Sequence, residues 1–267
     1  MKNILLLAHD DAGQEARFQC ALDLTRALGG HLTCVDVTQP PVVMAEYYGG
    51  IGGSTVLYDE AAQETANASR LKARLAKEDV SWDWIDATDS ITHCLRNLAQ
   101  IADVVVVSLR QHAAALPETG AIAASVWAGT RGLVLGVPED CDRFDVLGAA
   151  VIAWDGSPPV LATLRAAVPL LTLASSVLLL TVEDGSDGIA AEDAATYLSR
   201  HGIHATIQRV HDGLIAADEH IRDVCDDAHA AYCVMGAYGH SRITEAIFGG
   251  VTRRMLAKSD VPLVMGH

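Results

Sequence analysis

Short apolar runs alternate along the chain with longer stretches in which apolar residues recur at helical spacing. In the first half the apolar runs are residues 4–8, 31–37, 101–108 and 133–136. Runs with few polar interruptions are typical of strands buried on both faces of a parallel sheet. Residues 12–28 and 58–79 predict helices, and residues 82–87 predict a strand. Strands that alternate with helices indicate βαβ units with right-handed crossovers.

The second half repeats the same order of elements. Strands are predicted at 151–153, 177–182, 205–210, 230–236 and 263–266, and helices at 158–173, 189–201, 214–230 and 253–258. Residues 138–145 are charged, contain a proline and break both periodicities. The repeat therefore predicts two tandem open parallel-sheet (Rossmann-like) domains of the α/β class, at residues 1–140 and 146–267.

Composition narrows the class of partner. The net charge of −15 argues against binding to nucleic acid or to an anionic membrane, because both are bound by an excess of Lys and Arg. No apolar run approaches the length of a membrane span, and the run at 4–8 is too short for a secretory signal. The six cysteines form no C-x-x-C pair, and Cys34 and Cys233 lie within apolar runs as core residues. A reducing compartment, the cytoplasm, is expected.

Two segments are rich in glycine, and only the second has the spacing expected of a phosphate-binding loop. The segment 47–55 is rich in glycine but lacks the Lys-Ser/Thr ending of a P-loop and follows two prolines instead of a strand. In the segment 234–252, Gly236 and Gly239 are two residues apart, and nine residues then lead to Gly249 and Gly250. Glycines at the carboxyl end of a strand let the backbone approach a ligand, and the N–H groups that open the next helix attract phosphate.

This spacing resembles the signature of the universal stress protein family: Gly, two residues, Gly, nine residues, Gly, then Ser or Thr. The chain departs at the last position, where Gly250 stands for Ser or Thr, although Thr252 follows. The family's first strand ends in Asp-Gly-Ser, here at residues 155–157. The resemblance implies that ATP or a related adenine nucleotide, with or without Mg²⁺, is a regulatory ligand of the C-terminal domain. The implied contacts are Ala153, Asp155, Val182, Met235, Gly236, Gly239, Gly249, Gly250, Val251 and Thr252.

The N-terminal half lacks most of this motif. Ser108 aligns with Gly236 and Gln111 with Gly239, and only Gly120 survives near the third glycine. Asp10 aligns with Asp155, and Asp11 replaces the glycine that follows it. The resemblance thus implies a degenerate N-terminal domain. In this family the last strand pairs across a dimer interface, so residues 262–266 and 133–136 predict an intramolecular pseudo-dimer.

Simpler interpretations of the same residues stay open. The four glycines also suit turns, Asp155 also suits a helix N-cap or a turn, and Arg242 and Arg253 suit exposed charges. His240 and Ser241 lack the base and orienting group of a catalytic site, and no histidine spacing fits a metal. A non-enzymatic stress-response protein is therefore expected, with slow ATP hydrolysis left open. The alternative is an interaction or regulatory module of the same fold with a vestigial site. A further homodimer and a protein partner are left open.

Overall fold

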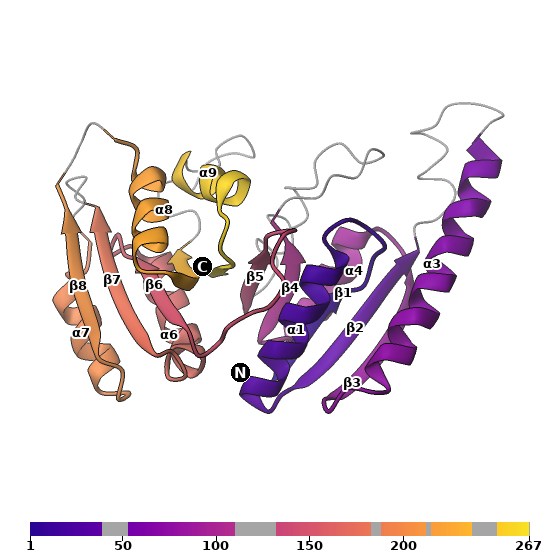
Figure 1. Cartoon of the computed structure of the whole chain (residues 1–267), viewed down its shortest axis with the longest axis horizontal. Helices are drawn as coiled ribbons and strands as arrows, with labels where there is room; N and C mark the ends of the chain where they lie inside the picture. Colours follow the sequence, from indigo (N-terminus) through magenta and orange to yellow (C-terminus); the bar gives the residue numbers. More distant parts are fainter. Residues whose placement is uncertain (39–52, 110–131, 183–187, 212–214, 237–249, 267) are drawn as a thin grey trace.

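A computed structural model describes residues 1–38, 53–109, 132–182, 188–211, 215–236 and 250–266, with the backbone alone for 53–63 (Figure 1). The first half contains β1 (Asn3–Leu7), α1 (Gln14–Leu28), β2 (His31–Thr38), α3 (Gly53–Leu75), β3 (Ser81–Thr88), α4 (Ile91–Leu98), a 3₁₀ turn (Ala99–Ile101), β4 (Val104–Ser108) and β5 (Leu133–Val137). The second half contains β6 (Ala149–Ala153), α6 (Pro158–Leu171), β7 (Ser176–Val182), α7 (Ala191–Ser199), β8 (Ala205–Val210), α8 (Ala217–Asp227), β9 (Ala230–Gly236), α9 (Gly250–Lys258) and β10 (Leu263–Gly266).

All the strands join one ten-stranded sheet in the order β3-β2-β1-β4-β5-β10-β9-β6-β7-β8. Read outward from the middle, each half has the same strand order, and every pairing within a half is parallel. The halves meet where β5 and β10 pair antiparallel, with Leu135 opposite Val264. A two-fold relation between the halves requires this antiparallel contact. The predicted fold class, two Rossmann-like halves packed as a pseudo-dimer, is confirmed.

Helices cover both faces of the sheet, so the core has two layers. On one face the sheet packs against α1, α3, α6 and α7, and that cluster runs through both halves. On the other face it packs against α4, α8 and α9. The predicted buried strands are confirmed, since all five residues of β4 are buried. The predicted core positions Cys34 and Cys233 are fully buried.

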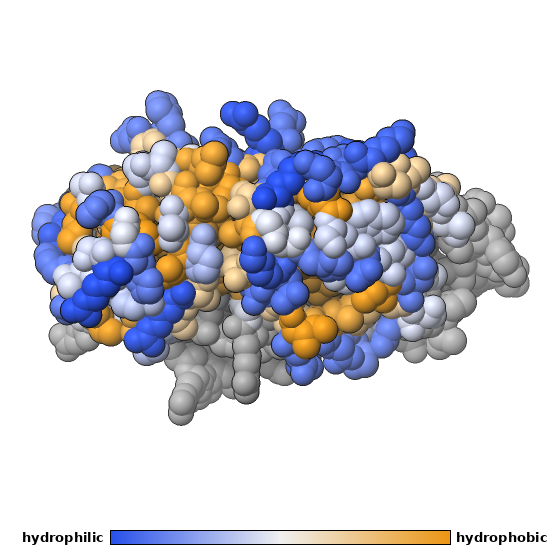
Figure 2. Space-filling view, turned by 90° about the horizontal axis from the view of Figure 1, so that it is seen from below, coloured by the Kyte–Doolittle hydropathy of each residue, from blue (hydrophilic) through white to orange (hydrophobic). Residues whose placement is uncertain are grey.

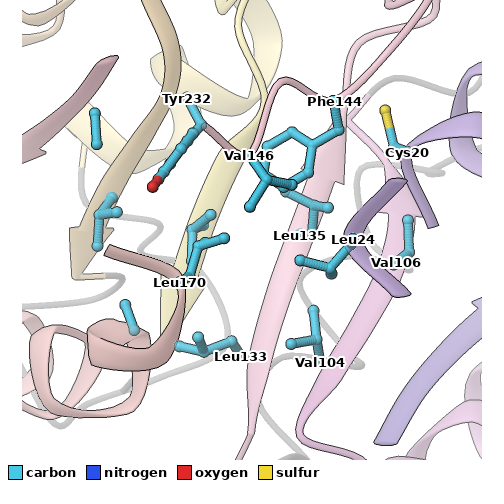
Figure 3. Packing of buried hydrophobic residues seen from close by; sticks show 14 of the residues in the cluster. Cys20, Leu24, Val104, Val106, Leu133, Leu135, Phe144, Val146, Leu170 and Tyr232 are labelled. Atoms are coloured by element: carbon cyan, nitrogen blue, oxygen red, sulfur yellow. The ribbon is translucent and has the colours of Figure 1, made fainter. Parts of the chain in front are cut away.

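The segment between β5 and β6 connects the halves and is anchored to both. Phe144 donates its backbone N–H to Oδ2 of Asp23 on α1 (3.0 Å), and its ring packs on Tyr232 of β9 with centroids 5.4 Å apart. Figure 3 shows these two rings between the strands of the two halves, with Val146 beside them. Phe144 and Val146 are 3% and 4% exposed. We call residues 138–145 the linker.

Several predicted bounds were wrong in detail. Helix α8 ends at Asp227, whereas the pattern carried it to 230, and α9 begins at Gly250, ahead of the predicted 253. The short helix α4 was not predicted at all. It begins after Ser90, whose Oγ accepts a hydrogen bond from the N–H of His93 (3.3 Å). This N-cap was the sequence signal that could have revealed α4.

The face at the amino ends of the strands carries two exposed apolar side chains. Ile101 precedes β4 and is 80% exposed, and Leu147 precedes β6 and is 62% exposed. Seen from below (Figure 2), apolar groups are interspersed with hydrophilic groups over this side of the molecule. In the part of the chain that the structure describes, no helix has the length and apolar character needed to cross a membrane.

Candidate functional site

The strand order places the candidate site of the second half. Strands β6 and β9 are neighbours, with Ala153 opposite Met235. The chain leaves β6 to build β7 and β8 on one side, and β9 and β10 lie on the other side. This is a topological switch point, where ligands of open α/β sheets bind beyond the carboxyl ends of the strands. Asp155 follows β6 and Gly236 ends β9, so the topology brings these two site residues together.

The loop from β6 to α6 is held in one conformation. Oδ1 of Asp155 accepts a hydrogen bond from the N–H of Ser157 (2.9 Å), so Asp155 is a turn residue. Gly156 has φ +68°, and an added Cβ would lie 2.5 Å from the backbone nitrogen of Ile189. Only glycine satisfies both requirements at this position. The helix N-cap is Ser157, not Asp155.

Ser157 is buried, yet its hydroxyl has no hydrogen-bond partner among the described residues and does not cap α6. Oγ1 of Thr181, near the end of the adjacent strand β7, is likewise buried without a partner in the described part of the chain. Buried polar atoms are normally satisfied, and exceptions need an explanation. Two unsatisfied hydroxyls near the carboxyl ends of β6 and β7 fit a site that accepts a polar ligand such as a nucleotide.

Gly236 has a structural role that is independent of any ligand. A Cβ at this position would lie 2.5 Å from the backbone nitrogen of Val160 in the first turn of α6. Backbone cannot yield as a flexible side chain can, so glycine is needed for the helix to pack against β9. The alternative interpretation of Gly236 as a packing glycine is therefore supported for this residue.

The remaining described contacts of the predicted site are at the N-terminus of α9. Gly250 is exposed, Val251 is partly buried and Thr252 is 6% exposed. Arg253 is exposed, and it is Arg254 that lies here, because a Cβ on Gly250 would be 2.8 Å from its Nη1. Nε of Arg254 pairs with Oδ1 of the fully buried Asp218 on α8.

Sequence reasoning missed this Arg254–Asp218 pair. Oδ2 of Asp218 has no hydrogen-bond partner within the described residues. The sequence of α8 did not indicate that Asp218 is buried and paired, because an Asp in the first turn of a helix is ordinarily an exposed charge.

The predicted apolar contacts lie together on one face of the sheet. Ala153, Val182, Met235 and Val251 all belong to, or pack against, the cluster beneath α8 and α9. They could form an apolar wall for a planar ligand. Gly239 and Gly249, the two remaining predicted contacts, lie outside the described residues, as do Arg242, His240 and Ser241.

The corresponding place in the first half is filled by Arg17 of α1, whose side chain is 0% exposed. Its Nη1 donates to Oδ1 of Asp11 (2.7 Å) and to Oγ of Ser108 (2.6 Å). Nη2 donates to the carbonyl oxygen of His9 (3.0 Å), and Nε donates to that of Leu7 (3.3 Å). One guanidinium therefore joins the carboxyl ends of β1 and β4 at the first half's own switch point.

The predicted alignment of Asp10 with Asp155 was wrong. Leu7 pairs with Val35 on β2, and Ala153 pairs with Leu180 on β7, so Leu7 and Ala153 hold equivalent places in the two halves. His9 and Asp155 each lie two residues further along the chain, so the strand register places His9 at the level of Asp155. However, Asp11 makes the same turn as Asp155, its Oδ1 accepting from the N–H of Gly13 (2.9 Å). The first half therefore has a longer loop here, and sequence alone could not separate the neighbouring aspartates.

Beside this loop lies a group of ionisable side chains from β1, β2 and α3. Nδ1 of His9 lies 2.8 Å from Oε1 of Glu64. Burial opposes protonation of His9, but the hydrogen bond and charge of Glu64 outweigh it and raise the pKa of His9. Burial, with Glu64 and Asp86 nearby, raises the pKa of Asp36 to about 6. Within the described ranges, no three His, Cys, Asp or Glu side chains are grouped so as to hold a metal ion.

The fold defines a class: a tandem α/β protein in which two Rossmann-like halves share one continuous sheet. Comparison with known proteins shows which proteins the chain resembles. No family model matches the chain. A universal stress protein of Synechocystis, Slr1230, is 24% identical over 99% of both chains.

Solved structures agree on the fold. A universal stress protein from Archaeoglobus fulgidus superposes with a TM-score of 0.74 at 13% identity, over 100% of this chain and 98% of its own. A structure titled as a putative universal stress protein from Pseudomonas aeruginosa gives 0.61 at 15% identity, over 100% and 93%. The resemblance predicted from the motif is confirmed: the chain resembles the universal stress proteins over its full length and has their fold.

Proposed function

We propose that this chain is a regulatory protein of the stress response that binds ATP or another adenine nucleotide in its second half. The observation that carries the proposal is the meeting of Asp155 and Gly236 at the switch point between β6 and β9. In this arrangement Asp155, Ala153 and Val182 hold the adenosine end. The N-terminus of α9, with Gly250 and Thr252, faces the phosphates, where free N–H groups and the helix dipole favour an anion. Met235 and Val251 flank the nucleotide.

One site per chain is expected. In the first half the buried guanidinium of Arg17 occupies the junction of β1 and β4 and is held by four acceptors. A nucleotide there would have to displace this network. The nucleotide acts in this proposal as a ligand, not as a substrate, and Mg²⁺ would accompany it through its phosphates. The domain division at 1–140 and 146–267 is part of the same proposal.

The proposal is tested by calorimetric titration of ATP, ADP and AMP into the nucleotide-free protein, with and without Mg²⁺. The expected result is one site per chain. Asp155→Asn keeps an acceptor for the N–H of Ser157 but removes the charge, so it should weaken binding by about tenfold, the scale of one hydrogen bond to a charged group. Asp11→Asn makes the same change in the matched turn of the first half and should leave binding unchanged.

A second variant tests the departure from the family motif. Gly250→Ser restores the hydroxyl, and its Cβ would lie 2.8 Å from Nη1 of Arg254, so the end of that side chain must shift to accommodate it. It should tighten binding of ATP more than binding of AMP, because the added donor faces phosphate. Gly236 is unsuitable for this purpose, since any side chain there collides with the backbone of Val160.

A second candidate function is an interaction module with a vestigial site. It is favoured by the finding that packing against Val160 accounts for Gly236 without a ligand. Absence of binding to all three nucleotides in the wild type and in Gly250→Ser would support this candidate and contradict the nucleotide proposal. Binding that appears only in Gly250→Ser would show a site lost through this one residue.

A further inference from the structure

Two cysteines far apart in sequence meet where the linker crosses α1. Sγ of Cys20 lies 3.6 Å from Sγ of Cys141, across 121 positions of sequence. Cys20 is on α1 and fully buried, whereas Cys141 is on the linker and partly exposed. Figure 3 shows the sulfur of Cys20 beside the region where Phe144 enters the core. We propose that Cys20 and Cys141 are a redox-sensitive pair, oxidised by a small neutral hydroperoxide to a disulfide that fastens the linker to α1. This inference does not depend on nucleotide binding.

The two sulfurs are chemically unequal, and this sets the order of events. The hydrogen bond from the Cys20 thiol lowers the pKa of Cys141. The same contact, together with burial, raises the pKa of Cys20. Cys141 also lines an open hollow on the surface. An accessible thiol with a lowered pKa beside a second thiol is the arrangement found in oxidant-sensing cysteines, with the second thiol resolving the first product.

The reaction balances with hydrogen peroxide as the oxidant. The Cys141 thiolate attacks one peroxide oxygen, the O–O bond breaks, and the departing hydroxide takes a proton to leave as water. The sulfur of Cys20 then attacks the sulfenic acid of Cys141. The S–S bond forms, the S–O bond breaks, and the hydroxyl leaves with the Cys20 proton as a second water. Two thiols lose two electrons, and one peroxide is reduced.

The geometry allows the second step with a small movement. A disulfide needs the sulfurs about 1.5 Å closer than they lie here. Cys141 is in the irregular linker, where its N–H donates to the carbonyl of Pro138 (3.2 Å), so it can approach Cys20 without disturbing a helix or strand.

The surroundings of Cys141 select the oxidant. The hollow that it lines carries four carboxylate residues, Glu15, Glu139, Asp140 and Asp142. An anionic disulfide such as oxidised glutathione is repelled by this field, whereas hydrogen peroxide is neutral. Peroxide should therefore form the link, and oxidised glutathione should react about tenfold more slowly at low salt than at high salt, where the field is screened. A glutathione reaction that is indifferent to salt would contradict the assignment of the oxidant.

The test treats the full-length reduced protein with hydrogen peroxide, blocks remaining thiols with an alkylating agent, and maps the peptides without reduction. The thiol count in denaturant should fall from six to four, with Cys20 linked to Cys141, and a reductant should restore it. Retention of all six thiols, or a link between other cysteines, would overturn the proposal.

Variants assign the roles. Cys141→Ser should leave every thiol reduced, because the buried Cys20 is out of reach. Cys20→Ser should stop at a sulfenic acid on Cys141 that a cyclic dione traps. If Cys20→Ser fails to fold, Cys141→Ser still tests whether Cys141 is the thiol that reacts with peroxide, because position 141 is partly exposed and tolerates the change. Cys225→Ser is the matched control: Cys225 and Cys233 also form a thiol contact but are 2% and 0% exposed, so this variant should still form the Cys20–Cys141 link.

Oxidation should also have a structural consequence. The disulfide closes a loop across 121 positions of sequence and so restricts the unfolded chain. The urea midpoint of the oxidised wild type should exceed that of the reduced wild type, with no such difference in Cys141→Ser. An unchanged midpoint would mean that the bond forms without holding the linker, which would overturn the proposed fastening.

Discussion

At the scale of single residues, Arg17 decides the difference between the two halves. An arginine in a helix ordinarily projects into water, and no pattern in the sequence marked this one as buried. Its five N–H donors suit the carboxylate, hydroxyl and two carbonyl oxygens that meet there, so its charge is paired although it is buried. By contrast, the hydroxyl of Ser157 in the second half has no hydrogen-bond partner in the part of the chain that the structure describes.

Arg17→Met is expected to lower the free energy of unfolding by about 3–5 kcal/mol, because it removes a fully buried guanidinium that pairs with Asp11 and leaves the buried hydroxyl of Ser108 and two carbonyl oxygens without that donor. The measurement is urea denaturation at neutral pH. The control is Arg209→Met on β8, which breaks an ion pair with Glu192 that is largely exposed and should change the midpoint little. Equal midpoints for the two variants would show that the Arg17 network contributes no more than a surface pair.

At the scale of elements, the strands were the most predictable part. The continuous run in β4 can only be buried on both faces, and the pairing of β5 with β10 was implied by the resemblance to the universal stress proteins. Helix ends were less certain, because the alanines at 228 and 230 suit a helix, whereas α8 ends at Asp227 and His229 takes a φ of 47°. The loop after β1 could not be aligned because Asp10 and Asp11 are chemically identical, and only the turn hydrogen bond from the N–H of Gly13 singles out Asp11.

The group at the carboxyl ends of β1 and β2 gives a prediction on pH. Asp36 on β2 is buried beside Asp86 of β3 and Glu64 of α3, with His9 and Lys72 as opposing charges. Its folded pKa, about 6, lies above the ordinary 3.8. Between these values the folded state holds a proton that the unfolded state has lost, so stability falls as pH rises from about 4 to about 6.

Asp36→Asn cannot ionise and should lose this part of the pH dependence, becoming more stable than the wild type above pH ~6. The measurement is the urea midpoint of both proteins across this range. His9 also favours the folded state at low pH, because its pKa is raised, and its contribution is lost as pH rises through that raised value. His9 is present in both proteins, so the difference between them isolates Asp36. A difference that does not vary with pH would refute the assignment.

At the scale of the whole molecule, the two halves share one sheet and one apolar core, and we expect them to unfold together. The sheet is continuous through β5 and β10, and one apolar cluster includes residues of both halves. Such continuity favours a single cooperative unfolding transition over two separate ones. The linker takes part in this core through Phe144, which is 3% exposed, so it is more than a connection.

Phe144→Ala tests this coupling. The ring is 3% exposed and packs on Tyr232 of the second half. Its removal should lower the free energy of unfolding by about 3–5 kcal/mol, while unfolding remains one transition. Leu147→Ala, close by but 62% exposed, should change stability by no more than about 0.5 kcal/mol. Urea unfolding followed by tryptophan fluorescence reports both halves, since Trp82 and Trp84 lie in β3 and Trp154 follows β6. Two separated transitions in Phe144→Ala, with only one shifted, would mean that the halves fold independently and that the ring stabilises one of them alone.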